Sequence, residues 1–212
     1  MPVWSYIIVA LAAYCLGSIP TGFLVARAKG VDIRTVGSGN MGATNVFRTL
    51  GKTAGVFVLI VDGLKGYAAC AWLGDWLLAA LNVHPAAAGH YRIVAGIAAV
   101  LGHNYTCWLR FKGGKGIATS AGAFFALAPL AAGIALGTWL VFLLASRYVS
   151  VASIAAAVAM PVAVWLTGDD LILKLATTAL GLLAIFKHKS NIQRLLRGTE
   201  RRFGEKSAEA AK

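Results

Sequence analysis

The sequence predicts an all-α fold, a polytopic bundle of transmembrane helices. Of the 212 residues, 58% are hydrophobic and only 13% are charged, whereas about 25% of the residues of an average soluble domain are charged. A water-soluble globule of this size has too little interior to bury so many apolar side chains. A lipid bilayer is therefore expected to cover them.

Seven apolar segments are candidates for crossing the bilayer, which takes about 20 residues in a helix. Several are short, so the count becomes six if residues 116–128 do not cross. In chain order, we expect the spans at about 3–25, 54–73, 91–105, 113–129, 130–145, 149–166 and 171–186.

The loops between these segments alternate in charge. Lys and Arg occur in residues 27–52, 110–115, 147 and 187–202, and the intervening loops have none. Because Lys and Arg favour the cytoplasmic side, we expect the N-terminus outside and the C-terminus in the cytoplasm. The net charge of +12 then indicates anionic lipid headgroups, and no nucleic acid partner.

We expect one transmembrane domain over residues 1–204. Residues 205–212 are polar and are expected to form a disordered tail.

The first polar segment of the cytoplasmic loops covers residues 36–48. Gly37, Gly39 and Gly42 fit a GxGxxG pattern, but a dinucleotide-binding fold would need a preceding strand, so we reject that interpretation. Closely spaced glycines still let backbone N–H groups approach an anion. The segment could instead be a small-residue loop that lets helices pack closely. Its further candidate ligand groups are Ser38, Asn40, Thr44, Asn45 and Arg48, and Ser38 or Asn40 could equally cap a helix.

The second polar segment is a glycine-rich turn with two lysines, and it precedes a helix. It lacks the spacing of a Walker A loop, yet its composition favours anion binding. The alternative is a flexible basic loop on anionic lipid. The candidate binding residues are Lys112, Gly113, Gly114, Lys115 and Gly116.

The third polar segment has two parts. Ser150 and Ser153 open the sixth span, where either serine could be a cap or could bond to its own helix. His188 and Asn191 follow the seventh span and are three residues apart, on one helical face. This part could also be a basic amphipathic tail on the headgroups.

Asp62 and Lys65 lie three apart within the second span. Ionisable residues at that depth suggest function, but their spacing favours a structural ion pair with each other.

Together these segments resemble, in order and over nearly the whole chain, the bacterial acyl-phosphate:glycerol-3-phosphate acyltransferases, a family of integral inner-membrane enzymes. The matching stretches are residues 18–22, 37–45 with Arg48, 62–66, 102–103, 111–116, 147–150 and 188–195 with Gly198 and Glu200.

The resemblance implies a reaction. A fatty acyl group would pass from acyl phosphate to the 1-hydroxyl of glycerol 3-phosphate and give lysophosphatidic acid and phosphate, the first acylation of phospholipid synthesis. The substrates would be acyl phosphate and glycerol 3-phosphate at the cytoplasmic face of the inner membrane, with an acyl-phosphate-producing enzyme upstream.

Acyl phosphate is a mixed anhydride with a good leaving group, so it needs positioning and charge stabilisation more than a covalent nucleophile. We therefore expect direct transfer. Ser38, the N–H groups after it, Arg48 and Lys115 would hold acyl phosphate, and His188 and Asn191 would position glycerol 3-phosphate. The proton could go to His188 or to a phosphate oxygen of the substrates.

The sequence contains no set of metal ligands, and we expect neither a metal nor a cofactor. Two other function classes remain open. One is a small transporter for a phosphorylated or other organic anion, although no repeat is visible. The other is a non-catalytic lipid-binding or scaffold protein.

Overall fold

The computed structural model describes residues 3–80, 88–168 and 170–205, and every regular element within these ranges is a helix. The all-α prediction is confirmed for this part of the chain. The chain divides into two compact units, Met1–Pro129 (unit 1) and Leu130–Lys212 (unit 2). A single domain over 1–204 stays a prediction, and residues 206–212 of the expected tail lie outside the described residues.

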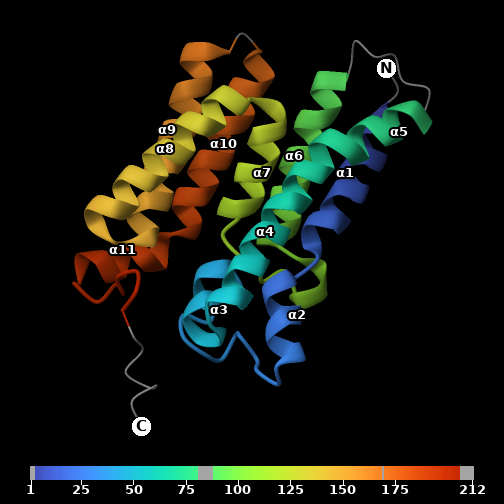
Figure 1. The fold of residues 1–212 in the computed structure, drawn as a ribbon. Helices are drawn as coiled ribbons and strands as arrows, with labels where there is room; N and C mark the ends of the chain where they lie inside the picture. The colour runs from blue at the N-terminus through green and yellow to red at the C-terminus, as the bar shows by residue number, and fades with distance from the viewer. Residues whose placement is uncertain (1–2, 81–87, 169, 206–212) are drawn as a thin grey trace. The chain divides into compact units, whose positions relative to one another are not determined.

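Unit 1 is a set of helices with two irregular turns. Figure 1 shows α1, α4, α6 and α7 side by side, with α2 and α3 at the end of the unit away from α5. The elements are α1 (Val3–Ser18), α2 (Thr21–Ala28), α3 (Ala43–Leu50), α4 (Lys52–Ala68), a π-helical turn (Ala69–Leu73), α5 (Gly74–Ala80), α6 (Ala88–Asn104), a 3-10 turn (Cys107–Leu109) and α7 (Ile117–Leu127).

Glycines let the long helices of unit 1 touch through their backbones. A Cβ atom at Gly17 of α1 would meet the backbone of Ala99 in α6. On the α4–α7 contact, a Cβ at Gly66 would meet the carbonyl of Thr119. Small residues at helix contacts permit such close approach inside membranes, where the lipid is as apolar as the protein.

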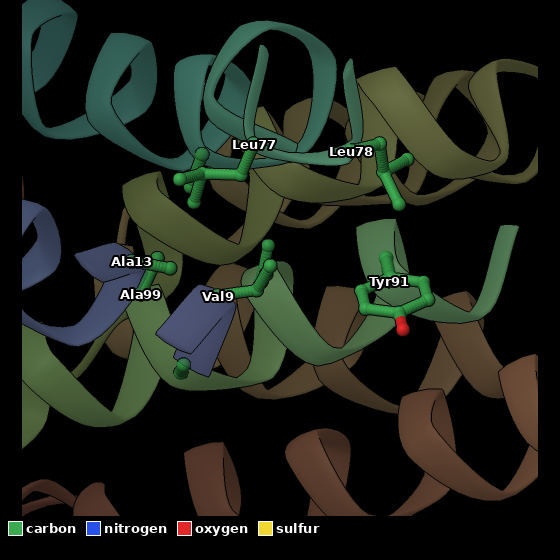
Figure 2. Packing of buried hydrophobic residues seen from close by; sticks show 9 residues of the cluster. Val9, Ala13, Leu77, Leu78, Tyr91 and Ala99 are labelled. Atoms are coloured by element: carbon green, nitrogen blue, oxygen red, sulfur yellow. The ribbon is translucent and has the colours of Figure 1, made fainter. Parts of the chain in front are cut away.

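One hydrophobic cluster of unit 1 joins α1, α5 and α6, as Figure 2 shows. Its largest fully buried side chain, Tyr91, exchanges a 2.5 Å hydrogen bond with the hydroxyl of Ser5 and stacks on the ring of Tyr6. The phenolic group of Tyr91 is thus satisfied inside the cluster, as buried hydroxyls require.

A second hydrophobic cluster holds the loops at the α2–α3 end of unit 1. It includes Ile33 and Met41 from the loop between α2 and α3, Val46 from α3 and Val58 from α4. Leu109, from the connection between α6 and α7, packs against it. The loop between α2 and α3 and the residues just before the glycine-rich turn therefore rest on the same hydrophobic cluster.

Unit 2 consists of α8 (Pro129–Ser146), which begins at the boundary, α9 (Val149–Thr167), α10 (Leu171–Lys187) and α11 (Lys189–Leu196). Pro161 lies inside α9, where it removes a backbone hydrogen bond from the carbonyl of Ala157. Gly181 of α10 approaches that carbonyl, since a Cβ there would lie 2.6 Å from it. The proline and the glycine together let α9 and α10 pack closely.

Within the described residues, four helical segments are long and apolar enough to cross a membrane: Val3–Ala28, Lys52–Ala80, Pro129–Ser146 and Val149–Thr167. The pair α10 and α11 is bent by 52° and counts as a fifth only if the two helices form one broken span rather than a re-entrant loop. The predicted count of seven spans is not confirmed, because α6 and α7 have only 17 and 11 residues. Only α7 of the two is an apolar helix, and each is shorter than the roughly 20 residues of a full crossing.

Candidate active site

The loop between α2 and α3 folds around one side-chain amide. Asn45 of α3 is buried, and its Nδ2 donates to the carbonyls of Val36 and Asn40, at 3.1 and 2.9 Å. Its Oδ1 accepts a hydrogen bond from the backbone N–H of Ser38 at 3.0 Å. Asn45 therefore fixes the shape of the loop, and its expected contact with substrate stays a prediction.

Two glycines give this loop its path. Gly37 and Gly39 have φ values of 61° and 68°, in the left-handed region that favours glycine. At Gly37 a Cβ would also strike Oδ1 of Asn45. The sequence pattern thus marks a specific backbone shape.

The loop uses several of its own N–H groups. The N–H of Gly39 donates to Val36, and that of Gly42 donates to Oδ1 of Asn40 at 2.8 Å. With the N–H of Ser38 also donating within the loop, these three groups are satisfied by protein acceptors. What the segment offers a ligand most directly is its side chains: Ser38 is exposed, and Thr44 and Arg48 of α3 are half-buried.

The glycine-rich turn packs onto the end of α6. The N–H groups of Gly113 and Gly114 donate to the carbonyls of Asn104 and His103, at 3.2 and 3.0 Å. A Cβ at Gly114 would strike the imidazole ring of His103. The first two glycines therefore permit close packing, rather than exposing N–H groups to an anion as the sequence suggested.

The two lysine side chains of this turn differ in their exposure to solvent. Lys112 is exposed and Lys115 is half-buried. Gly116, with φ of 79°, directly precedes the first turn of α7. Of the predicted groups in this turn, the two lysines are the ones whose charge suits a phosphate.

The centre of polar contacts in unit 2 is Glu200. Its Oε1 accepts hydrogen bonds from Nδ2 of Asn191 at 2.7 Å and from the hydroxyl of Ser150 at 2.9 Å. Its Oε2 accepts a 2.7 Å hydrogen bond from Nε of Arg194. We call Ser150, Asn191, Arg194 and Glu200 the Glu200 cluster. The structure thus brings two predicted site residues, Ser150 and Asn191, onto one carboxylate.

Electrostatics favours the charged form of Glu200. Burial raises the pKa of this carboxyl group, but hydrogen bonds from Asn191, Arg194 and Ser150 oppose it, and the net pKa lies below its ordinary value. The residue roles derived from chemistry did not include Glu200. The available signal was an acidic residue isolated in a basic tail, within the stretch that matches the family.

Ser153, the other candidate serine, has a different environment. Its hydroxyl accepts a 3.3 Å hydrogen bond from the indole N–H of Trp139 in α8. One helical turn separates it from Ser150, and its hydrogen-bond partner lies on α8, outside the Glu200 cluster.

His188 lies at the bend between α10 and α11 and is buried. Its Nδ1 lies 2.8 Å from the carbonyl oxygen of Ala184. Because a carbonyl can only accept, Nδ1 must carry the proton. In the neutral ring, Nε2 is then the nitrogen with the lone pair.

The residues after α11 return to the turn before α9. The N–H of Phe203 donates to the carbonyl of Arg147 at 2.6 Å, and Nη2 of Arg147 donates back to the carbonyl of Phe203 at 3.3 Å. Arg147 has φ of 61°, a strained value for a residue with a side chain. This double contact holds the segment that carries Glu200 beside Ser150.

No group of three or more potential metal-ligating side chains gathers within the residues that the structure describes.

The sequence comparisons identify the family. Residues 7–198 match the model of a family described as glycerol-3-phosphate acyltransferase. The chain belongs to the glycerol-3-phosphate acyltransferase family. Curated family members include proteins of that name from Geotalea daltonii, 47% identical over 94% of this chain and 98% of the relative, and from Synechococcus sp. strain JA-3-3Ab, 45% identical over 99% of this chain and the whole relative.

Two solved structures of a family member are similar to this chain. Both are crystal structures of PlsY, described as an integral membrane glycerol 3-phosphate acyltransferase, one in its glycerol 3-phosphate form and one in its lysophosphatidic acid form. They are 40% identical, with TM-scores of 0.84 and 0.81, over 94% of this chain and 96% of theirs. The protein is thus an integral membrane member of the acyltransferase family.

Proposed function

We propose that the protein transfers a fatty acyl group from acyl phosphate to the 1-hydroxyl of glycerol 3-phosphate, giving lysophosphatidic acid and phosphate. The observation that carries the proposal is the likeness, over 94% of the chain, to an acyltransferase with solved glycerol 3-phosphate and lysophosphatidic acid forms. The polar segments of this chain supply the cations and hydrogen-bonding groups that two phosphorylated substrates need.

The donor suits the chemistry of the candidate residues. Acyl phosphate is activated, so attack by the 1-hydroxyl breaks the bond between the acyl carbon and the phosphate oxygen and releases inorganic phosphate. The hydroxyl proton can pass to the departing phosphate, which balances the reaction without an added base. What the protein must add is positioning and neutralisation of charge.

Unit 1 supplies the groups proposed for acyl phosphate. Ser38 presents an exposed hydroxyl on a loop fixed by Asn45, and Arg48 and Lys115 supply positive charge. A guanidinium can bind a phosphate through two parallel hydrogen bonds, whereas an ammonium acts as a point charge. Arg48→Lys should therefore lose affinity for the donor although the charge is kept.

Unit 2 supplies the groups proposed for glycerol 3-phosphate. Asn191 is held by Glu200, and His188 is held by the carbonyl of Ala184. The fixed tautomer of His188 leaves Nε2 as the nitrogen able to accept a proton or a hydrogen bond. His188 therefore either removes the hydroxyl proton or orients the hydroxyl while a phosphate oxygen removes it.

Kinetics of His188→Ala separates these two roles. Loss of kcat with an unchanged KM for glycerol 3-phosphate supports proton removal by His188. A rise in that KM with unchanged kcat assigns His188 to binding alone, and a phosphate oxygen then takes the proton.

We also infer the place of the protein in the cell. The alternation of basic and non-basic loops supports seven crossings with the N-terminus outside, and the polar segments would then face the cytoplasm. In the bacterial inner membrane, that face gives access to soluble glycerol 3-phosphate and to lipid-like acyl phosphate. An enzyme that produces acyl phosphate must act upstream.

The test is a transfer assay on the purified protein in lipid, with radiolabelled glycerol 3-phosphate and either palmitoyl phosphate, palmitoyl-CoA or no donor. Labelled lysophosphatidic acid from palmitoyl phosphate alone, and its loss in Ser38→Ala and Arg48→Ala, is the expected result. Product from palmitoyl-CoA alone overturns the choice of donor. If the folded protein forms no product with any donor, uptake of labelled glycerol 3-phosphate tests the transporter alternative.

A further inference from the structure

Three ionisable side chains meet inside unit 1. Nζ of Lys65 lies 2.8 Å from Oδ1 of Asp62, which confirms the ion pair predicted between them. Nδ1 of His103 lies 3.7 Å from the same oxygen. All three are buried, with at most 5% of each residue exposed.

This cluster joins three parts of the unit. Asp62 and Lys65 belong to α4, His103 belongs to α6, and Nζ of Lys65 donates a 3.0 Å hydrogen bond to the carbonyl of Ile19, between α1 and α2. Burying two opposite charges gives little net stability compared with packed apolar side chains. Ionisable groups inside a membrane protein point to a functional constraint.

The His103 end of the cluster contacts the glycine-rich turn directly. The carbonyl of His103 accepts the N–H of Gly114 at 3.0 Å, and its imidazole occupies the space that a Cβ of Gly114 would need. The next residue, Lys115, carries the charge proposed for acyl phosphate. A displacement of His103 must therefore move the backbone beside Lys115.

We propose that Asp62 is a positioning residue for acyl phosphate. It acts on the position of the donor through His103 and the glycine-rich turn, without contacting the donor itself. Its carboxylate lies 3.7 Å from Nδ1 of His103, a distance that allows attraction to a protonated ring but no hydrogen bond. The carbonyl of His103 in turn accepts the N–H of Gly114, next to Lys115. This inference rests on the proposed function, because it concerns the same donor. Lys65 neutralises the carboxylate and attaches the arrangement to the break between α1 and α2.

The variants must remove the carboxylate without leaving a lone buried charge. Asp62→Asn alone leaves Lys65 unmatched, which is strongly destabilising. The double variant Asp62→Asn/Lys65→Met removes both charges and keeps the side-chain sizes similar. The matched control is Asp75→Asn/Arg92→Met. It removes the 2.7 Å ion pair between Asp75 of α5 and Arg92 of α6.

Kinetics gives the first measurement. In Asp62→Asn/Lys65→Met we expect KM for acyl phosphate to rise about tenfold, because small misplacement of a positioning group has large effects, while KM for glycerol 3-phosphate stays unchanged. The control should change neither KM. A rise in both KM values, or a fall in kcat alone, overturns the proposal.

A double-mutant cycle with Lys115→Ala gives the second measurement. If Asp62 acts through the turn, adding Asp62→Asn/Lys65→Met to Lys115→Ala causes no further rise in KM for acyl phosphate. If the two increases in KM multiply, Asp62 acts independently of Lys115 and the proposal is wrong.

Hydrogen exchange of the amides of residues 112–116 needs no activity. We expect faster exchange in Asp62→Asn/Lys65→Met and unchanged exchange in the Asp75→Asn/Arg92→Met control. Unchanged exchange in both overturns the positioning of the turn. If the wild type fails to use acyl phosphate but the exchange result holds, the donor assignment fails and the link from Asp62 to the turn stands.

Discussion

The carboxylate of Glu200 accepts a 2.7 Å hydrogen bond from the side-chain amide of Asn191. That contact leaves the carbonyl oxygen of the amide directed elsewhere, so the carboxylate determines which end of Asn191 can meet a ligand. Asn191, which is proposed to bind substrate, is thereby oriented by Glu200, which is not itself proposed to bind substrate.

Removing the carboxylate should therefore damage both stability and substrate binding. In Glu200→Ala, the buried Asn191 and Ser150 lose their acceptor, and each unsatisfied group costs about 1–3 kcal/mol. We expect a lower melting temperature and a higher KM for glycerol 3-phosphate. The control is Glu205→Ala, since Glu205 is exposed and accepts the backbone N–H of Arg202. Equal effects of the two substitutions would contradict the role of Glu200.

The Glu200 cluster should also make stability depend on acid. The folded-state pKa of Glu200 lies below its ordinary value of 4.5, through a balance of burial and the three opposing hydrogen bonds. The stabilisation is complete above the ordinary pKa and is lost as pH falls through the lower, folded-state pKa. Melting temperatures measured at decreasing pH should fall less steeply for Glu200→Gln than for the wild type. Parallel curves would show that Glu200 does not contribute.

Two glycines with similar backbone angles allow a matched test of the first loop. Gly30 and Gly37 have φ of 74° and 61°, but a Cβ at Gly30 would meet nothing within 4 Å, whereas one at Gly37 would strike Asn45. Gly30→Ala should cost only the backbone strain, about 1 kcal/mol. Gly37→Ala should cost more and raise KM for acyl phosphate, because the loop must shift away from Asn45. Steady-state kinetics and thermal melts of both variants provide the measurement, and identical behaviour would refute the packing argument.

The two serines of α9 should separate in the same way. Ser150→Ala removes a donor to Glu200 and should raise KM for glycerol 3-phosphate. Ser153→Ala removes an acceptor of Trp139 and should lower the melting temperature with little change in that KM. A raised KM for glycerol 3-phosphate in Ser153→Ala but not in Ser150→Ala would reverse the assignment.

Composition predicted the fold class well, because a chain with so few charges leaves few alternatives to a membrane bundle. The apolar segments expected near residues 91–105 and 113–129 are helical, as α6 and α7. The sequence did not show whether these two helices are long enough to cross the membrane, because hydropathy does not show where an apolar helix ends. The glycine-rich turn at residues 112–116 shortens α7 to 11 residues, whereas α6, with 17 residues, is no shorter than the segment expected at 91–105.

The candidate site was predictable in its residue types but not in its contacts. The pattern of glycines, polar side chains and cations marked the loops correctly as unusual. It could not show that Asn45, Gly113 and Gly114 direct their hydrogen-bonding groups toward the protein, since those partners lie on other turns of the chain. The pair Asp62 and Lys65 was predictable because helical geometry places residues three apart on one face.

The hydrogen bonds from Gly113 and Gly114 to the end of α6 change the field in which an anion would approach. The carbonyls at the end of a helix carry the negative pole of its macrodipole, equivalent to about half an elementary charge, and repel phosphate. Here the carbonyls of His103 and Asn104 are covered by two N–H groups. The two N–H groups thus reduce the repulsion that this end of α6 would exert on the phosphate proposed to bind Lys115.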